Sequence, residues 1–326
     1  MYEITLSVIM TTYNHERYIA EAIESVLRQQ TSFGVEIVVG EDSSTDRTLN
    51  IVRDYASMYP ECIRIVTSEE NVGWRKNYRR TIAAARGKYV ALLDGDDYFT
   101  HRKKLAMQVE LLEADPELGM CYTRSERIDE SGNTTIYPES EECPSSFEAM
   151  LRRNPAENCT VVARRELVER YYDEIRPEEH PEWLTDDLPM WLWFAANSKY
   201  VGIDCPMAVH RVLKYSVSHD TDYRRKIAFV DSLVDISLWY DAGPRAPPVS
   251  GRGGGLFSAG LFSAARAQAP TSTWLPLVTG TGTRRLPLGP RSPDRGLLEF
   301  PAFVRGLLKG TPHTISPNLD GGTHSL

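Results

Sequence analysis

The chain has 326 residues, enough for one large domain or two smaller ones, and a net charge of −8. This acidic balance argues against a nucleic-acid-binding protein, because phosphate contacts need a basic face. No apolar run reaches the roughly 18 residues of a membrane span, and no secretory signal is expected. The five scattered cysteines form no CxxC motif, which favours a reducing cytoplasm over a disulfide framework.

Short apolar runs alternate with helical patterns over the first third of the chain. The spacing of apolar residues predicts strands at 4–10, 35–39, 63–67 and 88–93. It predicts helices at 16–30, 45–58, 74–85 and 101–114, with Ser44 as the N-cap of the second helix. Because crossovers between parallel strands supply helices to both faces, the alternation predicts a mostly parallel α/β sheet.

The pattern becomes less regular after residue 114. Strands are predicted at 120–125 and 159–163, and helices at 146–153, 187–197 and 223–240. In the last helix, apolar residues at helical spacing predict a face packed against the domain, with an amphipathic helix docked on a membrane as the alternative. These residues are Ile227, Val230, Val234 and Leu238. From Gly243 onward Pro, Gly, Arg, Ala and Ser dominate. Residues 243–326 are therefore interpreted either as a disordered, low-complexity tail of non-native sequence or as an irregular folded appendage.

Polar residues follow each of the first four predicted strands. In an open parallel sheet, ligands bind outside the carboxyl ends of the strands, so these residues are expected to converge on one site. The residues are Thr11, Tyr13 and Asn14 after the first strand, Glu41 and Asp42 after the second, Asn71, Arg75 and Lys76 after the third, and Asp94, Asp96 and Asp97 after the fourth.

The acidic turn Asp94-Gly95-Asp96-Asp97 suits a divalent cation such as Mg²⁺ or Mn²⁺, which prefers hard oxygen ligands. Gly95 is expected to let the backbone turn so that the carboxylates face one point. The alternative is a solvated Asp-rich surface turn. The other strand ends have alternatives of the same kind: a packed tyrosine at 13, a helix cap at 42, and a solvated basic face at 75 and 76.

The stretches SVIMTTYNHERYIAEAIESVLRQQ, EIVVGEDSSTDRT, ENVGWRKNYRRTIAAARGKY and ALLDGDDYF occur in this order. Together they resemble the nucleotide-binding half of inverting family 2 glycosyltransferases with the GT-A fold, of the type that builds bacterial surface polysaccharides. The likeness is specific over residues 7–112 and traceable to His219. It implies a Rossmann-like, mostly parallel sheet with helices on both faces and an acceptor-side α/β extension. Residues 1–115 would form the nucleotide-sugar half, 116–242 the acceptor half, and 243–326 the tail.

The resemblance also implies roles for individual residues. Thr11, Tyr13 and Asn14 match the loop that contacts the nucleoside, and Asp42 matches the acid that contacts the nucleobase. Asp94 and Asp96 match the acid–x–acid pair near ribose and metal, and Asp97 the next acid, which is the metal ligand in some relatives. The choice between Asp96 and Asp97 stays open. Glu41-Asp42-Ser43 departs from the two aspartates and glycine usual in the family.

The second half of the chain supplies the expected catalytic base. The stretch WLTDDLPMWLWFA matches the family's base-bearing helix, with Asp187 as the base and Asp186 as the alternative. A structural interpretation also exists, in which Thr185 and Asp186 cap the helix while Trp191, Leu192 and Phe194 pack it. Further on, AVHRVLKYSVSH resembles the family's closing strand and loop, which makes His210, Arg211 and His219 candidates for phosphate or metal contact.

The resemblance therefore implies transfer of a sugar from a nucleotide-diphosphate donor, expected to be a UDP-sugar, with Mn²⁺ or Mg²⁺ as cofactor. The acceptor would be a hydroxyl of a glycan or lipid-linked molecule, and the protein cytoplasmic, with peripheral association at the inner membrane face left open. Alternatives are an inactive nucleotide-sugar-binding protein and a sugar-phosphate nucleotidyltransferase. The latter would need a glycine-rich basic loop where TTYNHER stands. A glycoside hydrolase could use two carboxylates but would need no metal turn.

Overall fold

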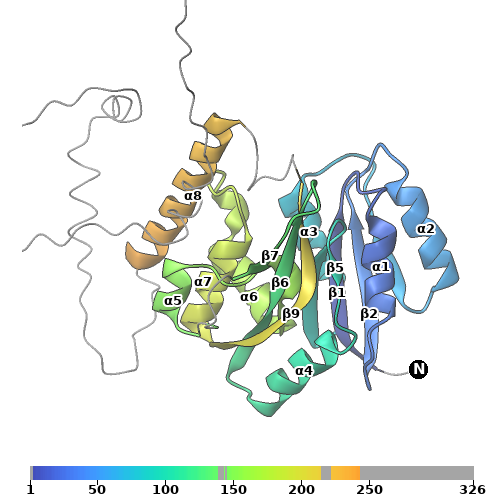
Figure 1. The fold of residues 1–326 in the computed structure, drawn as a ribbon, viewed down its shortest axis with the longest axis horizontal. Coiled ribbons are helices and arrows are strands. Elements are labelled where there is room, and N and C mark those ends of the chain that lie inside the picture. Colours follow the sequence, from blue (N-terminus) through green and yellow to red (C-terminus); the bar gives the residue numbers. More distant parts are fainter. Residues whose placement is uncertain (1–2, 139–142, 144, 214–221, 243–326) are drawn as a thin grey trace, which may run out of the picture.

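The protein is described by a computed structural model of residues 3–138, 143, 145–213 and 222–242 (Figure 1). His219 and the predicted tail, 243–326, lie outside the described residues. None of the described helices is both long and apolar enough to cross a membrane.

Within the described residues, nine strands form one sheet in the order β3-β2-β1-β4-β8-β6-β9-β5, with β7 pairing β6. The pairs β1–β2, β1–β4, β2–β3 and β6–β9 are parallel, whereas β8 runs antiparallel to both β4 and β6. The strands are β1 (Ile4–Thr12), β2 (Gly34–Glu41), β3 (Ile63–Val66), β4 (Tyr89–Asp94), β5 (Tyr98–Phe99), β6 (Leu118–Asp129), β7 (Thr134–Tyr137), β8 (Val162–Arg164) and β9 (Lys199–Val212).

Helices cover both faces of the sheet, and each face has its own apolar core. Alternate residues of a strand enter opposite cores: Val8 and Met10 pack with α1, α2 and α4, whereas Ile9 packs with α3, α6 and α7. The helices are α1 (Ile19–Leu27), α2 (Thr48–Met58), α3 (Trp74–Ala83), α4 (Lys104–Ala114), α5 (Phe147–Arg152), α6 (Arg165–Ile175), α7 (Asp187–Asn197) and α8 (Tyr223–Ala242), with short 3₁₀ turns η1 (Asn158–Thr160) and η2 (Pro177–Glu179).

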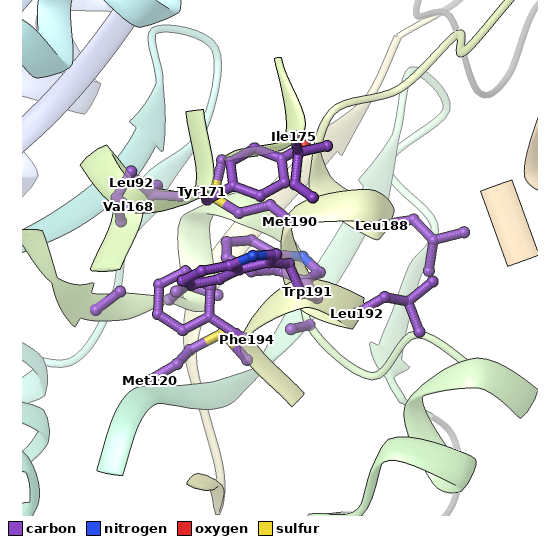
Figure 2. Close-up of a cluster of buried hydrophobic side chains, with 14 of the residues drawn as sticks. Leu92, Met120, Val168, Tyr171, Ile175, Leu188, Met190, Trp191, Leu192 and Phe194 are labelled. Carbon is purple, nitrogen blue, oxygen red and sulfur yellow. The ribbon is translucent and has the colours of Figure 1, made fainter. Parts of the chain in front are cut away.

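Helix α7 lies deep in the core that contains Ile9, on the face of the sheet covered by α3 and α6. Figure 2 shows its Trp191 and Phe194 among Leu92 and Met120 of the sheet and Tyr171 of α6. Both α7 side chains are fully buried. The predicted packing role of Trp191, Leu192 and Phe194 is therefore confirmed.

The mostly parallel α/β sheet agrees with the prediction, and every strand and helix predicted before residue 115 is present. The N-cap prediction at Ser44 is wrong: α2 begins at Thr48, and Ser44 Oγ instead accepts a hydrogen bond from Asn14 N at 3.0 Å. The strand predicted at 159–163 is in fact the turn η1 followed by β8.

Helix α8 packs against the domain, as predicted, but with a different face (Figure 1). Ile227 is 44% exposed, and Val230, Val234 and Leu238 are only half-buried. The buried positions are instead Phe229, Leu233, Ile236 and Tyr240. The Tyr240 hydroxyl donates to Pro189 O at 2.7 Å, so α8 braces the first turn of α7.

Candidate active site

The carboxyl ends of the parallel strands lie in one row. Thr11 of β1 pairs with Asp94 of β4, and Thr12 pairs with Glu41 of β2. Thr11 Oγ1 donates to Asp94 Oδ1 at 2.5 Å. The expected convergence of polar residues at this edge is thus present for the first, second and fourth strands.

The acidic turn is compact because Gly95 packs closely against β1. A Cβ at Gly95 would lie 2.7 Å from Thr12 Oγ1 and 2.9 Å from Thr12 Cβ. Gly95 N donates to Thr11 O at 2.8 Å, and Asp97 N to Asp94 O at 3.0 Å. Glycine is therefore needed at position 95 because a side chain would collide with Thr12. The sequence predicted that Gly95 would be needed for an unusual backbone turn, but its φ lies outside the left-handed region.

The turn concentrates negative charge that the surrounding residues compensate only in part. Burial, and then the charge of Asp96, raises the pKa of Asp94, while Thr11 and Asn158 lower it by hydrogen bonding. Burial and the charge of Asp97 raise the pKa of Asp96. His15 Nδ1 lies 3.9 Å from Asp96 Oδ1. Two hard carboxylates in a partly buried, negative environment fit a divalent cation.

Asp97 contacts strand β9. Its Oδ1 accepts from Arg211 N at 2.8 Å, and its Oδ2 lies 3.1 Å from His210 Nδ1. Burial lowers the pKa of His210, but the charges of Asp97 and Glu157 outweigh it and raise the value to about 10. The carboxylate of Asp97 is only 2% exposed, so this contact is shielded from solvent.

Arg211 also forms a hydrogen bond to the acidic turn. Its guanidinium donates to Asp96 O and, at 2.5 Å, to Glu21 Oε2 of α1. His210 and Arg211 thus connect β9 to the turn. Asp97, Cys159 and His210 do bring possible ligand atoms within 4.8 Å of one another. Burial, however, raises the pKa of the Cys159 thiol well above its usual range, and a protonated thiol is a poor ligand.

Asp42 organises the loop that follows β3. Its Oδ1 accepts from Val72 N at 2.9 Å and its Oδ2 from Gly73 N at 3.0 Å. Asn71 Nδ2 donates to Asp42 O at 3.0 Å. The carboxylate is almost fully buried, with Arg80 Nη2 at 3.6 Å. Asp42 and Asn71 are therefore brought together at the predicted nucleotide edge, where Asp42 fixes the backbone of the loop.

Glu41 and Ser43 shape the loop after β2. Glu41 is fully buried and accepts from Ser43 N, Ser44 N and Thr67 Oγ1 at 3.2, 2.7 and 3.0 Å. Ser43 stands where the family usually has glycine, and its φ is +59°. This left-handed backbone explains why glycine suits the position.

Asn14 has a left-handed backbone as well, with φ at +57°. Its side-chain Oδ1 accepts from Thr45 N at 2.8 Å, which links the loops after β1 and β2. Tyr13, beside it, is 42% exposed. The structure thus leaves the Tyr13 ring available at the rim, as contact with a nucleoside requires.

Arg75 and Lys76 differ in their surroundings. Lys76 is exposed on α3. Arg75 is directed at the second half of the chain: its Nε donates to Asp186 Oδ1 at 2.8 Å and its Nη2 to Trp183 O at 2.7 Å. Sequence reasoning placed Arg75 near phosphate, and the structure gives it these protein partners.

The two acids that open α7 have separate environments. Asp186 is buried against Arg75, and burial raises its pKa to about 6 although Arg75 lowers it. Asp187 is more accessible; its Oδ1 accepts from Thr185 Oγ1 and from Leu188 N, the latter at 2.8 Å. Burial is the main cause that raises the pKa of Asp187, and Glu157 adds to it. A partly accessible carboxylate with a raised pKa is suited to accept a proton.

Tyr78 of α3 lies within electrostatic reach of both sets of acids. Burial, and among the nearby charges those of Asp94, Asp186 and Asp187, raises the pKa of its phenol well above the usual value. Its hydroxyl is buried and lacks a hydrogen-bond partner in the described part of the chain. Tyr78 therefore lies between Asp94 and the two acids that open α7, close enough to feel the charge of each.

Sequence reasoning missed Glu157 and Asn158. Asn158 Nδ2 lies 3.4 Å from Asp94 Oδ2, and Glu157 accepts from Ser125 Oγ and, at 2.6 Å, from Arg127 Nε. Both residues precede β8, which is antiparallel to β4, so the entry to β8 lies at the carboxyl edge of β4. These residues precede a strand and do not follow one, so a pattern of polar residues after strands does not include them. If β8 had been predicted to be antiparallel to β4, the residues before it would have been expected at the same edge.

The sheet topology and the acidic turn define an α/β fold of the GT-A glycosyltransferase class. The sequence model described as Glycosyl transferase family 2 matches residues 7–169. The chain belongs to this family.

Related proteins and structures agree with this assignment. The chain is 30% identical over 241 residues to EpsE of Bacillus subtilis, whose own assignment as a glycosyltransferase is provisional, and covers 81% of it. It is 33% identical over 225 residues to an uncharacterised protein of Mycobacterium tuberculosis, with 68% of this chain and 63% of that relative's length covered. The structure of S. aureus TarS 1–349 in complex with UDP-GlcNAc is similar at a TM-score of 0.54 and 20% identity, covering 72% of this chain and 67% of that one. That likeness concerns the fold alone.

Proposed function

We propose that the protein is an inverting, metal-dependent glycosyltransferase that uses a UDP-sugar donor. The observation that carries the proposal is the position of the acidic turn Asp94–Asp97: it follows β4 at the carboxyl edge of the sheet, where Asp94 pairs with and accepts a hydrogen bond from Thr11. Family membership supports transfer of a sugar, and the TarS complexes with UDP and UDP-GlcNAc favour UDP as the nucleotide.

Asp96 is the proposed metal ligand, with Asp94 beside it toward the ribose. Among the described residues, the side-chain contact given for the Asp96 carboxylate is His15 Nδ1 at 3.9 Å, whereas both Asp97 oxygens contact β9. When bound, Mg²⁺ or Mn²⁺ supplies a Lewis acid that offsets the negative charge of the diphosphate leaving group. Asp97, His210 and Arg211 hold the turn in the geometry that this role needs.

The nucleoside is proposed to lie over the loops after β1, β2 and β3. Asp42 keeps residues 71–73 in place, and Asn14 links the first two loops. Tyr13 offers an exposed ring for stacking, and Lys76 an exposed cation near the same edge.

Asp187 is the proposed general base. An acceptor hydroxyl has a high pKa, so its proton must pass to a nearby base as the oxygen attacks. Asp187 Oδ1 already accepts two hydrogen bonds, which orients the carboxylate. Attack from the face opposite the diphosphate inverts the anomeric centre in one step, without a covalent bond to the protein.

The acceptor is proposed to be a hydroxyl of a glycan or of a lipid-linked molecule in surface-polysaccharide synthesis. The first turns of α8 expose Tyr223 and Ile227, at 58% and 44%, beside Arg224 and Lys226. Aromatic, aliphatic and basic side chains together suit contact with an anionic membrane surface. Co-sedimentation with anionic vesicles, for the protein and a Tyr223→Ser, Ile227→Ser variant, tests this part of the proposal.

Calorimetric titration with UDP, with and without Mn²⁺, tests the central proposal. Asp96→Ala should abolish metal-dependent binding. The exposed Asp173 of α6 supplies a matched control, since Asp173→Ala removes a carboxylate that is not part of the proposed nucleotide or metal site and should leave binding unchanged. Binding of GDP in place of UDP would overturn the donor assignment. Folded protein that binds neither nucleotide would overturn the transferase proposal for this chain, and binding without sugar transfer to any acceptor would favour an inactive nucleotide-sugar-binding protein.

A further inference from the structure

Arg75 joins the first half of the chain to the segment that precedes α7. Its three donor nitrogens contact His180 O at 3.5 Å, Trp183 O at 2.7 Å and Asp186 Oδ1 at 2.8 Å. The Arg75 side chain is 17% exposed and that of Asp186 is 9% exposed, so solvent weakens the ion pair little. The planar guanidinium also packs on Trp74, with 4.7 Å between its central carbon and the ring centroid.

The backbone of Arg75 directly follows the loop at residues 71–73. Arg75 is the second residue of α3, and Gly73 is the residue that precedes this helix. Val72 N and Gly73 N donate to the two carboxylate oxygens of Asp42. Asp42 is therefore linked to Arg75 in two steps: by hydrogen bonds to residues 72 and 73, and then along the chain into the first turn of α3.

This link ends at the proposed base. Asp186 directly precedes Asp187 and is the N-cap residue of α7, yet its carboxylate makes no capping bond to the helix. That carboxylate bonds Arg75 through Oδ1, and its Oδ2 is buried without a hydrogen-bond partner in the part of the chain that the structure describes. The contact with Arg75 therefore holds Asp186, the residue directly before Asp187.

We propose that Arg75 is a positioning residue that couples nucleotide binding at the Asp42 loop to the placement of Asp187. The inference rests on the proposed nucleotide site and base. A nucleotide that orders residues 71–73 would, through Arg75, also order the first turn of α7. The base would then be held in position when donor is present, which limits misplacement of a group whose position matters on the scale of 1 Å.

Hydrogen exchange with and without UDP and Mn²⁺ tests this coupling without needing the acceptor. In the wild type, UDP should slow exchange of the amides at 184–190 by about tenfold. In Arg75→Gln, UDP should bind within about threefold of the wild-type affinity but slow those amides less than about twofold. Arg75→Lys keeps the charge and loses the planar fork, so it should restore part of the effect.

Arg79 provides the matched control. It also lies on α3 and pairs with Glu178 of the same segment, but both side chains are exposed, at 47% and 37%. Arg79→Gln should leave the UDP-dependent protection at 184–190 intact. Equal loss in Arg79→Gln and Arg75→Gln, or full protection in Arg75→Gln, would overturn the inference. Failure of the wild type to bind UDP would instead overturn the proposed nucleotide site, and the inference with it.

Discussion

Lys104 is a fully buried lysine in the core, and replacing it tests how strongly the fold disfavours its charge. It opens α4, its Nζ donates to Gln108 Oε1 at 2.9 Å, and it lies 4.2 Å from the centroid of the Phe99 ring. Burial lowers the pKa of Lys104 to about 7. Lys104→Met keeps a side chain of similar length and removes the ionisable group.

The sign of the pH effect follows from proton binding. An unfolded lysine titrates near 10.5, so between about pH 7 and 10.5 the unfolded chain binds more protons than the folded one. The free energy of unfolding of the wild type therefore rises with pH in this window, and the full cost of Lys104 is present below it. The gap in pKa corresponds to on the order of 5 kcal/mol. The variant leaves Gln108 Oε1 without its donor, at a cost of about 1–3 kcal/mol, so it should be about 2–4 kcal/mol more stable at pH 7.

Urea unfolding at several pH values measures this directly. The advantage of Lys104→Met should shrink by about 1.4 kcal/mol for each pH unit above 7. Lys103→Met, at the exposed neighbouring lysine, should leave the pH dependence of the wild type unchanged. If the difference between wild type and Lys104→Met is the same at all pH values, Lys104 keeps its charge in the folded protein and the reasoning fails.

Substitutions at three further positions probe the edge of the sheet, each measured by urea unfolding. Asp97→Asn should cost about 2–4 kcal/mol, because the His210 imidazolium loses its buried counter-charge; an unchanged midpoint would contradict the link between the turn and β9. Ser43→Gly should be neutral or stabilising by up to about 1 kcal/mol, whereas Ser43→Val should cost at least about 1 kcal/mol at this left-handed position; the reverse order would refute the backbone argument. Gly95→Ala should cost about 1–3 kcal/mol by forcing the turn away from Thr12, and should also weaken UDP binding in calorimetry; a variant as stable as wild type would show that the turn can yield.

The fold of the first 114 residues was predictable because its strands are buried on both faces and its helices are amphipathic. Runs such as Val8–Met10 therefore stand out from the sequence alone. The exception in this part is the two-residue strand β5, which was not predicted because so short a strand carries no periodic signal. The later part mixes parallel and antiparallel strands, and partly polar strands such as β7 carry little periodic signal. The sequence of α8 contains more than one apolar stripe at helical spacing. Which stripe is buried depends on the side chains of α7 against which α8 packs.

The candidate site was predictable where chemistry coincides with a parallel strand end, as at Thr11, Glu41 and Asp94. Contacts that join distant segments were not. The partners of Arg75 lie more than 100 positions away in the sequence, and no local pattern marks Asp186 as one of them. For the same reason the sequence could not show that Asp97 contacts β9, which is the contact on which the proposed choice of Asp96 over Asp97 depends.

The antiparallel insertion of β8 also bears on how the chain folds during synthesis. Strands β1 to β4 assemble through local crossovers and are complete at Asp94, but one edge of β4 stays unpaired until residues 162–164 arrive. An open edge beside apolar strands is a template for pairing with other chains. The parallel pairing of β6 with β9 then waits for residue 199 onward, so the first half remains exposed to aggregation until much of the second half has been made. A fragment that ends near residue 115 would keep the edge proposed to bind the nucleotide but would carry that open strand permanently.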